Sequence, residues 1–354
     1  MTGPDVDLDA LARDFDVEFA ELDGVVTAMP YDSASPFEDE MQHNEKVSAA
    51  VRRALQQDTT TCEAQSVTSI WGLDRTDQTN LPLDSSYTNP TDSSACLCGL
   101  GAHVYILDTG IRVTHNEFSG RMSTGASFIS GVDSCKCTGP NEPDYCGGVC
   151  DGHGHGTHCA GTAAGTTYGI AKCATIHAVK VLSDSGSGSY SGIISAINWV
   201  VDQGQPNSII SMSLGGPGNS QGIKIAIDAA HAAGVITVVA AGNSNANACG
   251  YSPAFVPNAV TVGATTSSDS RSGFSNYGTC VDVFAPGSSI RSAYKSSDTS
   301  TTYMSGTSMA CPHVAGAAAL LVSKAQAPKP SADLVVTALT RTFATLNKIT
   351  NAGP

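Results

Sequence analysis

From residue 71 onward, short apolar runs alternate with segments whose apolar residues recur at helical spacing. The apolar runs are His103–Asp108, Ile176–Leu182, Ser208–Leu214, Val235–Ala241 and Ala259–Ala264. Several are apolar on consecutive residues, as expected of strands buried on both faces. Helical spacing marks Gly192–Val201 and Gln221–Ala233, and Gly234 is a good helix stop. Strands that alternate with helices predict an α/β fold in three layers, with a central, mostly parallel sheet flanked by helices.

The first 66 residues have a different pattern. A short helix and then a strand over Asp16–Leu22 are expected within residues 1–28. Residues 29–66 are polar and acidic, with one helix expected near Glu45–Gln57. Residues 1–66 hold fifteen acidic and four basic side chains, so they carry −11 of the formal net charge of −14. We interpret 29–66 as a connector that leads to a main domain over 67–354.

Composition narrows the class of protein. Hydrophobic residues make up 41% of the chain and charged ones 14%, which fits a sizeable buried core. The acidic balance argues against nucleic acid as a partner, because a phosphate backbone attracts a basic face. No apolar run is long enough to span a bilayer, so no membrane association is expected. Twelve cysteines indicate an oxidising compartment and a secreted protein. Met1–Asp9 contain no hydrophobic signal core, so we expect the true N-terminus to be missing.

Three segments place reactive side chains where catalytic groups are often found. Asp108 ends an apolar run and precedes a glycine turn, at the carboxyl end of a predicted strand. His155 lies among glycines in Gly152–Gly161. Ser308 follows a glycine and precedes a helical run with Pro312 in its first turn, where helix amide groups favour a developing negative charge.

Each segment alone has an alternative interpretation. Asp108 fits a turn or helix cap, and Ser308 fits a simple helix N-cap. The three histidines at 153, 155 and 158 are spaced so that they fit a zinc site, although no acidic or cysteine partner has ordinary zinc spacing. Together the segments favour catalysis: a serine hydroxyl needs a general base, a histidine supplies it, and a buried aspartate orients that histidine.

In combination, the motifs Asp108-Thr-Gly, His155-Gly-Thr-His and Gly306-Thr-Ser308-Met-Ala resemble those of subtilases of the proteinase K and aqualysin group. The similarity runs from about Trp71 to about Lys324. It implies a subtilisin-like serine endopeptidase, made as a zymogen, that cleaves protein and peptide substrates without a catalytic cofactor. The resemblance also implies broad specificity, with an apolar or aromatic residue before the cleaved bond, and we expect a monomer.

The resemblance implies further site residues. Asn243 matches the family's oxyanion-hole asparagine, with the Ser308 backbone amide as second donor. Gly186, Ser187 and Gly188 resemble the edge strand that pairs with an extended substrate. The walls of the primary specificity pocket are expected to be Ser213, Leu214, Gly215, Gly216, Ala240, Ala241 and Gly242.

A structural calcium site and a disulfide are implied in the same way. The calcium ligands would be the carbonyls of Pro257 and Ala259 and the carboxylate of Asp282, and oxygen ligands of this kind suit calcium. Cys249 and Cys280 match an aqualysin-type disulfide. The group's other bridge is missing, because Gly152 and Ser185 stand at the positions expected for it.

The remaining cysteines are less determined. An insertion before His155, from Cys135 to Cys150, is interpreted as a disulfide-stapled loop, with a small zinc knot as the alternative. Cys159 resembles a buried free thiol below the catalytic histidine. Pairing cannot be deduced from the sequence for Cys62, Cys96, Cys98, Cys135, Cys137, Cys146, Cys150, Cys173 and Cys311.

Both chain ends suggest an incomplete gene product. Residues 1–28 resemble the end of the family's inhibitory propeptide, so maturation would cut between Ala28 and Ile70. The C-terminus stops before the family's final strand. Two alternatives from other classes remain: a catalytically silent subtilase that acts as a binding module, and a metal-binding protein that uses its cysteines and histidines.

Overall fold

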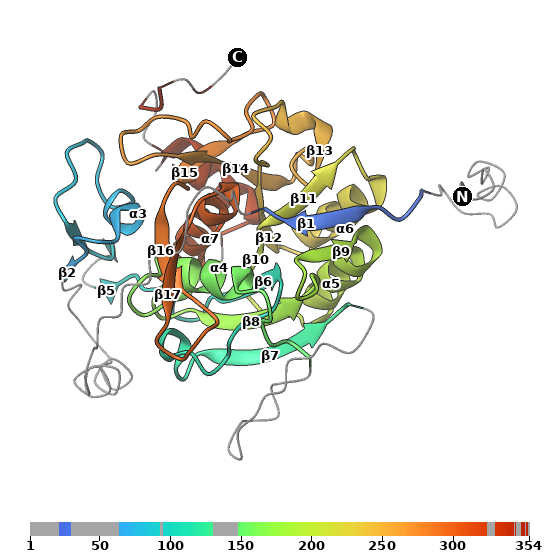
Figure 1. Cartoon of the computed structure of the whole chain (residues 1–354), viewed down its shortest axis with the longest axis horizontal. Coiled ribbons are helices and arrows are strands. Elements are labelled where there is room, and N and C mark those ends of the chain that lie inside the picture. Colours follow the sequence, from blue (N-terminus) through green and yellow to red (C-terminus); the bar gives the residue numbers. More distant parts are fainter. Residues whose placement is uncertain are drawn as a thin grey trace, which may run out of the picture.

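The computed structural model describes residues 21–29, 64–92, 95–129, 148–323, 330–342, 344, 348–350 and 352. At its centre lies a parallel sheet of seven strands in the order β15-β14-β12-β10-β6-β8-β7 (Figure 1). These strands are β6 (His103–Asp108), β7 (Met122–Ser127), β8 (Thr175–Lys180), β10 (Ser208–Met212), β12 (Ile236–Ala240), β14 (Ala259–Thr265) and β15 (Val283–Pro286). The parallel sheet predicted from the apolar runs is confirmed.

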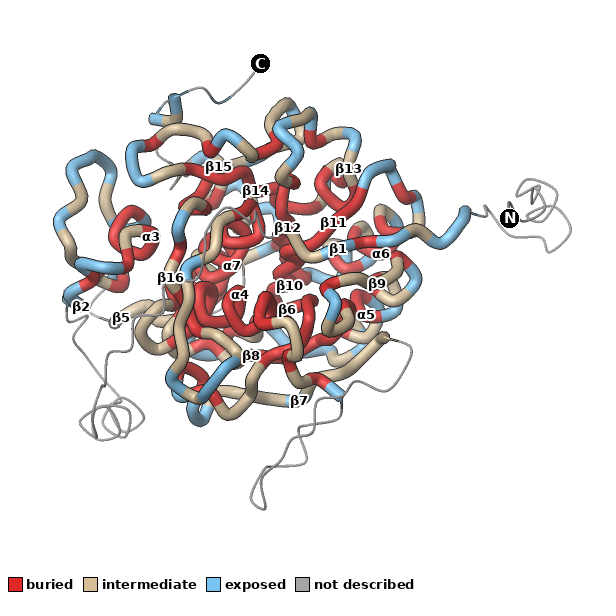
Figure 2. Tube along the Cα trace, in the orientation of Figure 1, coloured by how far each residue is buried: buried red, intermediate tan, exposed pale blue. Residues whose placement is uncertain are grey.

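Helices cover both faces of this sheet. Helices α4 (His155–Ala164) and α7 (Thr307–Ser323) pack on one face, and α5 (Tyr190–Asp202) and α6 (Gln221–Ala232) pack on the other. Successive residues of each strand alternate between the two cores. Val104 and Ile106 of β6, for example, belong to the α4/α7 core, whereas Tyr105 and Leu107 belong to the α5/α6 core. The burial of both strand faces is plain in Figure 2 and gives the predicted three-layer α/β fold.

A second sheet joins four segments that lie far apart along the chain. Its strand order is β13-β11-β1-β9, with β1 (Val25–Ala28), β9 (Ser187–Ser189), β11 (Leu214–Pro217) and β13 (Tyr251–Ser252). β1 is antiparallel to both of its neighbours. Two edges from the main domain thus hold a strand from the N-terminal region between them.

The other elements are short. They are β2 (Gln65–Ser66), α3 (Trp71–Asp74), β3 (Ser86–Tyr87), β4 (Thr91–Asp92), β5 (Ala95–Cys96), η1 (Asn116–Phe118), η3 (Ala248–Gly250), β16 (Ile290–Ala293), β17 (Thr301–Met304), α8 (Ala332–Thr337) and η4 (Ala338–Thr342). No helix in the described ranges has the length and apolar character that crossing a membrane requires.

Most of the strand expected over Asp16–Leu22 lies outside the described residues; its last two residues, Glu21 and Leu22, are not in a strand, and the strand described in this region is Val25–Ala28. One local expectation was wrong. Pro312 lies inside α7, beyond its first turn, because the helix already begins at Thr307. The helix expected over Glu45–Gln57 lies outside the described residues.

Candidate active site

The structure brings together the three residues that the motifs single out. Asp108 is the last residue of β6, His155 the first of α4 and Ser308 the second of α7, and none of the three is measurably exposed. Nδ1 of His155 donates to Oδ1 of Asp108 at 2.7 Å. This bond fixes the tautomer that leaves Nε2 with a free lone pair, as a general base requires.

In the structure the serine hydroxyl is turned away from this base. Oγ of Ser308 donates to the carbonyl of Ser213 at 3.0 Å, and Nε2 of His155 is buried without a hydrogen-bond partner. A rotation of the Ser308 side chain about its first torsion angle exchanges one acceptor for the other. In this arrangement the Ser308 hydroxyl is hydrogen-bonded to a backbone carbonyl next to His155.

Asp151 fixes the loop that leads to His155. Its buried carboxylate accepts hydrogen bonds from the backbone amides of His153, Gly154 and Thr157 and from the hydroxyls of Thr157 and Thr109, at 2.6–3.0 Å. Gly154 has φ +105°, and a Cβ there would overlap the ring of Tyr294. Sequence reasoning missed Asp151, although an aspartate just before a glycine-rich helix start signals such a cap.

The proline in α7 changes the surroundings of Ser308. Pro312 has no N–H to donate to the Ser308 carbonyl one helical turn earlier. That carbonyl instead accepts from Oγ of Ser213 at 2.8 Å and from Sγ of Cys159 at 3.5 Å. The backbone of the nucleophile is thus tied to β10–β11 and to α4 as well as to its own helix.

Asn243 points its side-chain amide into the same space. Its Oδ1 accepts from the backbone N–H and the hydroxyl of Thr307, both at 2.9 Å, which orients the NH₂ group away from α7. Its Nδ2 donates to the carbonyl oxygen of Met29 at 2.5 Å. The carbonyl group of Met29, the residue just after β1, therefore lies in the cleft of Ser308, and its oxygen accepts a hydrogen bond from Asn243.

Strand β1 fills a groove between two edges. Thr27 faces Ser187 on β9 and Gly215 on β11, and Ala28 faces Leu214. The backbone N–H of Ala28 donates to the carbonyl of Gly186 at 2.8 Å. An extended peptide held on both sides by main-chain hydrogen bonds is recognised largely irrespective of its side chains. The predicted edge-strand residues 186–188 thus do line the groove.

Met29 lies against the predicted pocket wall. A Cβ on Gly215 would overlap Cε of Met29, so the glycine leaves room for this side chain. Gly216 in turn lies beside the carbonyl of Val25. Ala240 and Ala241 are fully buried at the end of β12, and Gly242 follows them with φ +104°. Sequence reasoning did not identify Met29 as the occupant of the cleft.

Two acidic residues ahead of β1 cap helices of the main domain. Glu21 accepts from the amides of Gln221 and Gly222 and from the hydroxyl of Ser220, at the start of α6. Asp23 accepts from the amide and hydroxyl of Ser191, in the first turn of α5. Carboxylates are favourable at helix N-termini because of the exposed N–H groups and the helix dipole. These contacts add a second docking point to the strand pairing.

The predicted calcium ligands lie at the start of β14 and just before β15. Oδ2 of Asp282 accepts from the backbone N–H of Thr261 at 2.8 Å, and no basic side chain among the described residues forms an ion pair with Asp282. Burial raises the pKa of Asp282, and the hydrogen bond from Thr261 only partly offsets this. A buried carboxylate without a positive partner among the described residues is the kind of oxygen ligand that a hard divalent cation takes.

Four cysteines are paired in two described disulfides. Cys249–Cys280 forms as predicted, with an S–S distance of 2.06 Å, and Cys98–Cys173 forms in addition. The side chain that faces Gly152 is that of Asp184 rather than Ser185: a Cβ on Gly152 would overlap its carboxylate, which accepts the Gly152 N–H at 3.2 Å. The stapled loop expected for the insertion lies almost wholly outside the described residues, but Cys150 at its end is described and is free, so the expectation that this cysteine is bridged was wrong.

The histidines do not assemble into a zinc site. His158 Nε2 bonds the carbonyl of Ile290, and burial lowers the pKa of His158 to about 3. The one metal-sized group of acidic, histidine or cysteine side chains in the described ranges joins Asp108, His155 and Cys159. Burial, followed by the charge of Asp108, raises the pKa of the Cys159 thiol well above its usual value. This group is therefore the hydrogen-bonded Asp108–His155 pair with a protonated thiol beside it, and Cys159 is free as predicted.

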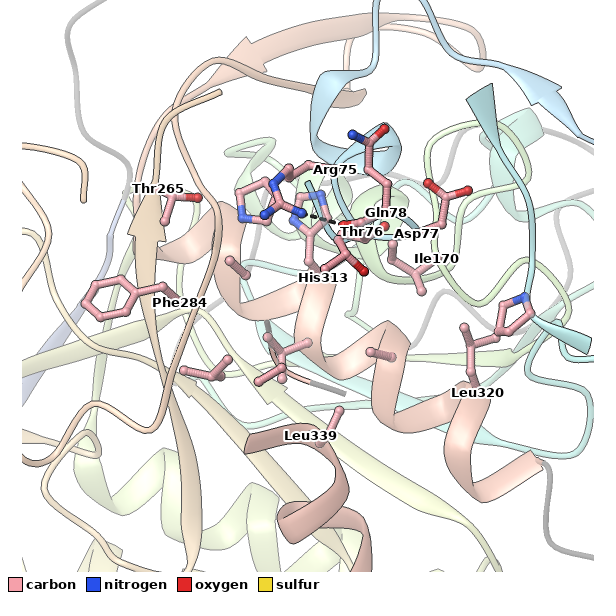
Figure 3. Close-up of a pocket in the computed structure, with 18 of the residues that line it drawn as sticks. Arg75, Thr76, Asp77, Gln78, Ile170, Thr265, Phe284, His313, Leu320 and Leu339 are labelled. Carbon is pink, nitrogen blue, oxygen red and sulfur yellow. Dashed lines mark hydrogen bonds between the residues drawn. The ribbon is translucent and has the colours of Figure 1, made fainter. Parts of the chain in front are cut away.

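A cavity of about 800 Å³ lies elsewhere in the fold, along α7 (Figure 3). Its wall includes His313, Arg75 and Leu320, and none of the three triad residues lines it. Nδ1 of His313 bonds the carbonyl of Met309 at 2.7 Å, and burial lowers the pKa of His313 to about 4. This histidine is therefore a neutral structural residue.

Comparisons with known proteins agree with this geometry. The model of the subtilase family, Peptidase_S8, matches residues 99–352. An extracellular serine proteinase of Thermus sp. is 48% identical over 80% of this chain and 64% of its own length. A cuticle-degrading serine protease of Arthrobotrys oligospora is 47% identical over 77% of this chain and 63% of its own length. The chain thus spans less than two thirds of these relatives.

A solved structure is similar as well. The crystal structure of a cold-adapted subtilisin-like serine proteinase aligns with a TM-score of 0.70 and 46% identity, over 80% of this chain and 94% of that one.

Proposed function

This chain belongs to the subtilase family, and from that premise we propose that it is a serine endopeptidase with Asp108, His155 and Ser308 as its catalytic triad. One observation carries the proposal: the carbonyl of Met29, in an extended peptide bound along the cleft, accepts a hydrogen bond from Asn243. The observation supports an oxyanion hole next to the serine. The names of the relatives agree with this activity.

The mechanism is acyl transfer to serine. Ser308 rotates from the Ser213 carbonyl to Nε2 of His155, which removes the hydroxyl proton as Oγ attacks the substrate carbonyl. Asp108 holds the imidazole through Nδ1 and stabilises its cation. The oxyanion is bound by the Asn243 amide and the Ser308 backbone N–H. His155 then protonates the leaving amine, and water hydrolyses the acyl-enzyme by the same steps in reverse.

The pocket supports apolar specificity. Met29 packs on the hydrophobic core beside Gly215, and Ala240 and Ala241 add small apolar side chains next to Gly242. We expect apolar or aromatic residues before the cleaved bond, with little demand on the residues that pair as a strand.

We further propose that residues 21–29 belong to an inhibitory propeptide. They fill the cleft as a substrate does, and Glu21 and Asp23 anchor them to α6 and α5. Maturation then cuts between Ala28 and Ile70 and frees the cleft. The same occupancy favours the second candidate, a silent subtilase whose cleft stays closed by its own chain.

Calcium is proposed to stabilise the fold. Pro257 and Ala259 would bind it through backbone carbonyls and Asp282 through its carboxylate, and the ion would supply charge neutralisation without taking part in peptide hydrolysis. Secretion is proposed as well, because a relative from Thermus sp. is named extracellular and the described residues include two disulfides.

Fluorophosphonate labelling tests the main proposal. The chain is incubated in calcium-containing buffer until N-terminal sequencing shows that the propeptide has been cut, and is then labelled beside the Ser308→Ala variant. Labelling of the parent alone is expected, because only an activated serine reacts. A folded parent with an emptied cleft that remains unlabelled would instead establish the silent binding module.

A further inference from the structure

His153 lies between the catalytic histidine and the bound segment. Its ring centroid is 6.2 Å from that of His155. Its Nε2 is 3.1 Å from the place that a Cβ on Gly186 would take, and Cβ of Ala28 is 3.7 Å from that same place. Because residue 186 is glycine, a small gap remains there. This gap separates the imidazole of His153 from the side chain of Ala28.

The imidazole of His153 forms no hydrogen bond that would fix its place among the described residues. Nδ1 is buried without a partner, and no hydrogen bond to either ring nitrogen is formed there. The other histidines of the main domain behave differently: His115, His158 and His313 each bond a backbone carbonyl through the ring. The backbone of His153 is fixed by Asp151, so its ring is held in place while its polar atoms remain available.

Charged groups face this ring from several elements. His155 comes from α4, Asp108 from β6, Asp151 from the loop before α4 and Lys295 from the loop after β16. Asp184, between β8 and β9, lies against the same loop at Gly152.

These surroundings decide when the ring is charged. Burial, then His155, lowers the pKa of His153, while Asp151 and Asp108 oppose the shift and Lys295 adds to it. The ring is therefore mostly neutral at pH 7 and above and takes up a proton only as the pH falls.

We propose that His153 selects the side chain of the substrate residue just before the one in the primary pocket, favouring acidic over basic side chains as the pH falls. The inference rests on the proposed endopeptidase function and deepens it by naming a substrate class. Ala28 is too short to cross the gap, whereas a glutamate at its position reaches the imidazole edge. A lysine there would meet a like charge when the ring is protonated.

The contact can be tested without any catalysis. In the Ser308→Ala background, Ala28→Glu and Ala28→Lys are introduced, and the titration of His153 is followed by NMR of ¹³C-labelled histidine, with His153→Asn to assign the signal. The Ala28→Glu change is expected to raise the pKa of His153, and Ala28→Lys to lower it, each on the order of 0.5–1 unit. Val25→Glu, at a residue 70% exposed, is the matched control and should shift it little. Equal titration in all variants would overturn the proposal.

Kinetics then test selection of substrate. Blocked Val-Thr-Xaa-Met nitroanilides copy Val26–Met29, with glutamate or lysine as Xaa. The ratio of kcat/KM for glutamate over lysine cancels the shared titration of the triad. It should rise as the pH falls, by about fivefold between the neutral and the protonated form of His153. The rise should vanish in His153→Asn. Hydrolysis with the same rise in His153→Asn would refute the role of His153. An NMR shift without any hydrolysis would refute the protease proposal and leave the binding contact standing.

Discussion

The carbonyl oxygen of Ser308 and the ring nitrogen of Pro312 stand one helical turn apart, and no hydrogen bond joins them because proline has no N–H. Instead, the hydroxyl of Ser213 donates a hydrogen bond to this carbonyl at 2.8 Å. Ser308 is thereby linked to the residue just before β11, the strand that forms one edge of the groove around β1. The position of Ser308 depends on a side chain that comes from outside its own helix.

Replacing Ser213 with alanine should expose this dependence. The Ser308 carbonyl loses its best donor while buried, so we expect unfolding free energy to fall by about 1 kcal/mol and kcat to fall more than KM changes. In a Pro312→Ala background, the new N–H at 312 can serve the carbonyl, and the cost of Ser213→Ala should shrink. Denaturant unfolding of the four variants measures this coupling. Additive losses would contradict the shared-carbonyl account.

Asn243 should contribute mainly to the transition state. Thr307 fixes its amide group, and Nδ2 lies on the Met29 carbonyl oxygen. Loss of such a donor costs on the order of 3 kcal/mol, so Asn243→Ala should lower kcat about 10²- to 10³-fold with a similar KM. Steady-state kinetics check this, with the exposed Asn245→Ala as control. A loss confined to KM would show that Asn243 only binds ground-state substrate.

Parts of the site and of the fold were predictable from the sequence. The placement of Asp108, His155 and Ser308 in one site was predictable, because each stands at the end of an apolar run or in a glycine-rich helix start and the three motifs are specific in combination. Their catalytic role stays a prediction. Strands β6, β8, β10, β12 and β14 followed from apolar runs, with ends shifted by at most two residues.

The partners of these elements were not predictable. β1 is a strand because β9 and β11 offer two open edges, which is a property of the folded groove and not of residues 25–28. The Cys98–Cys173 pair spans 75 residues, and no local signal relates two such cysteines. The place of His153 beside Gly186 was not predictable either, because it depends on how two loops meet.

Cys159 should be inert to alkylation yet sensitive to mercury. Burial raises the pKa of its thiol, so at pH 8 almost no thiolate exists for iodoacetamide to modify. A mercurial that reaches Sγ, 3.9 Å from Nδ1 of His155, would displace the histidine and reduce activity. Mass spectrometry and activity assays on the parent, Cys159→Ser and the equally buried Cys311→Ser check this. Undiminished mercurial inhibition of Cys159→Ser would contradict the placement.

Calcium removal should lower thermal stability. With EDTA the melting temperature is expected to fall on the order of 5 °C, and Asp282→Asn should remove most of this calcium dependence. The raised pKa of Asp282 gives the sign with pH. In the calcium-free protein the burial favours the protonated carboxyl, so its stabilising effect is full below the unfolded pKa and is lost as pH rises through the folded one.

Calcium reverses that trend, because only the ionised carboxylate binds it. Differential scanning calorimetry across pH 4–8, with and without calcium, should therefore show curves that diverge as pH rises. The outcome that would count against the site is a calcium effect in Asp282→Asn as large as in the parent.

Asp151 should act as a positioning residue for His155. Its Oδ1 holds His153, Gly154 and Thr109, and its Oδ2 holds Thr157. Asp151→Asn keeps one oxygen but turns an NH₂ group toward the Thr157 amide. We expect kcat to fall about tenfold with KM little changed, because the imidazole is displaced while the cleft is intact. Asp151→Ala, which keeps no acceptor, should fall further.

The pH profile of kcat/KM tests the charge of Asp151, because a purely structural role would leave this profile unchanged. Removing a buried negative charge near the imidazole makes its cation less favourable, so the acidic limb of the kcat/KM profile should shift to lower pH in Asp151→Asn. Asp228→Asn, which replaces a carboxylate on α6 paired with Lys224, is the matched control and should leave the profile in place. If Asp151→Asn melts at a lower temperature but keeps the parental profile and kcat, the carboxylate only stabilises the loop. A shifted limb together with a reduced kcat would assign it both the placement and the charge of the catalytic base.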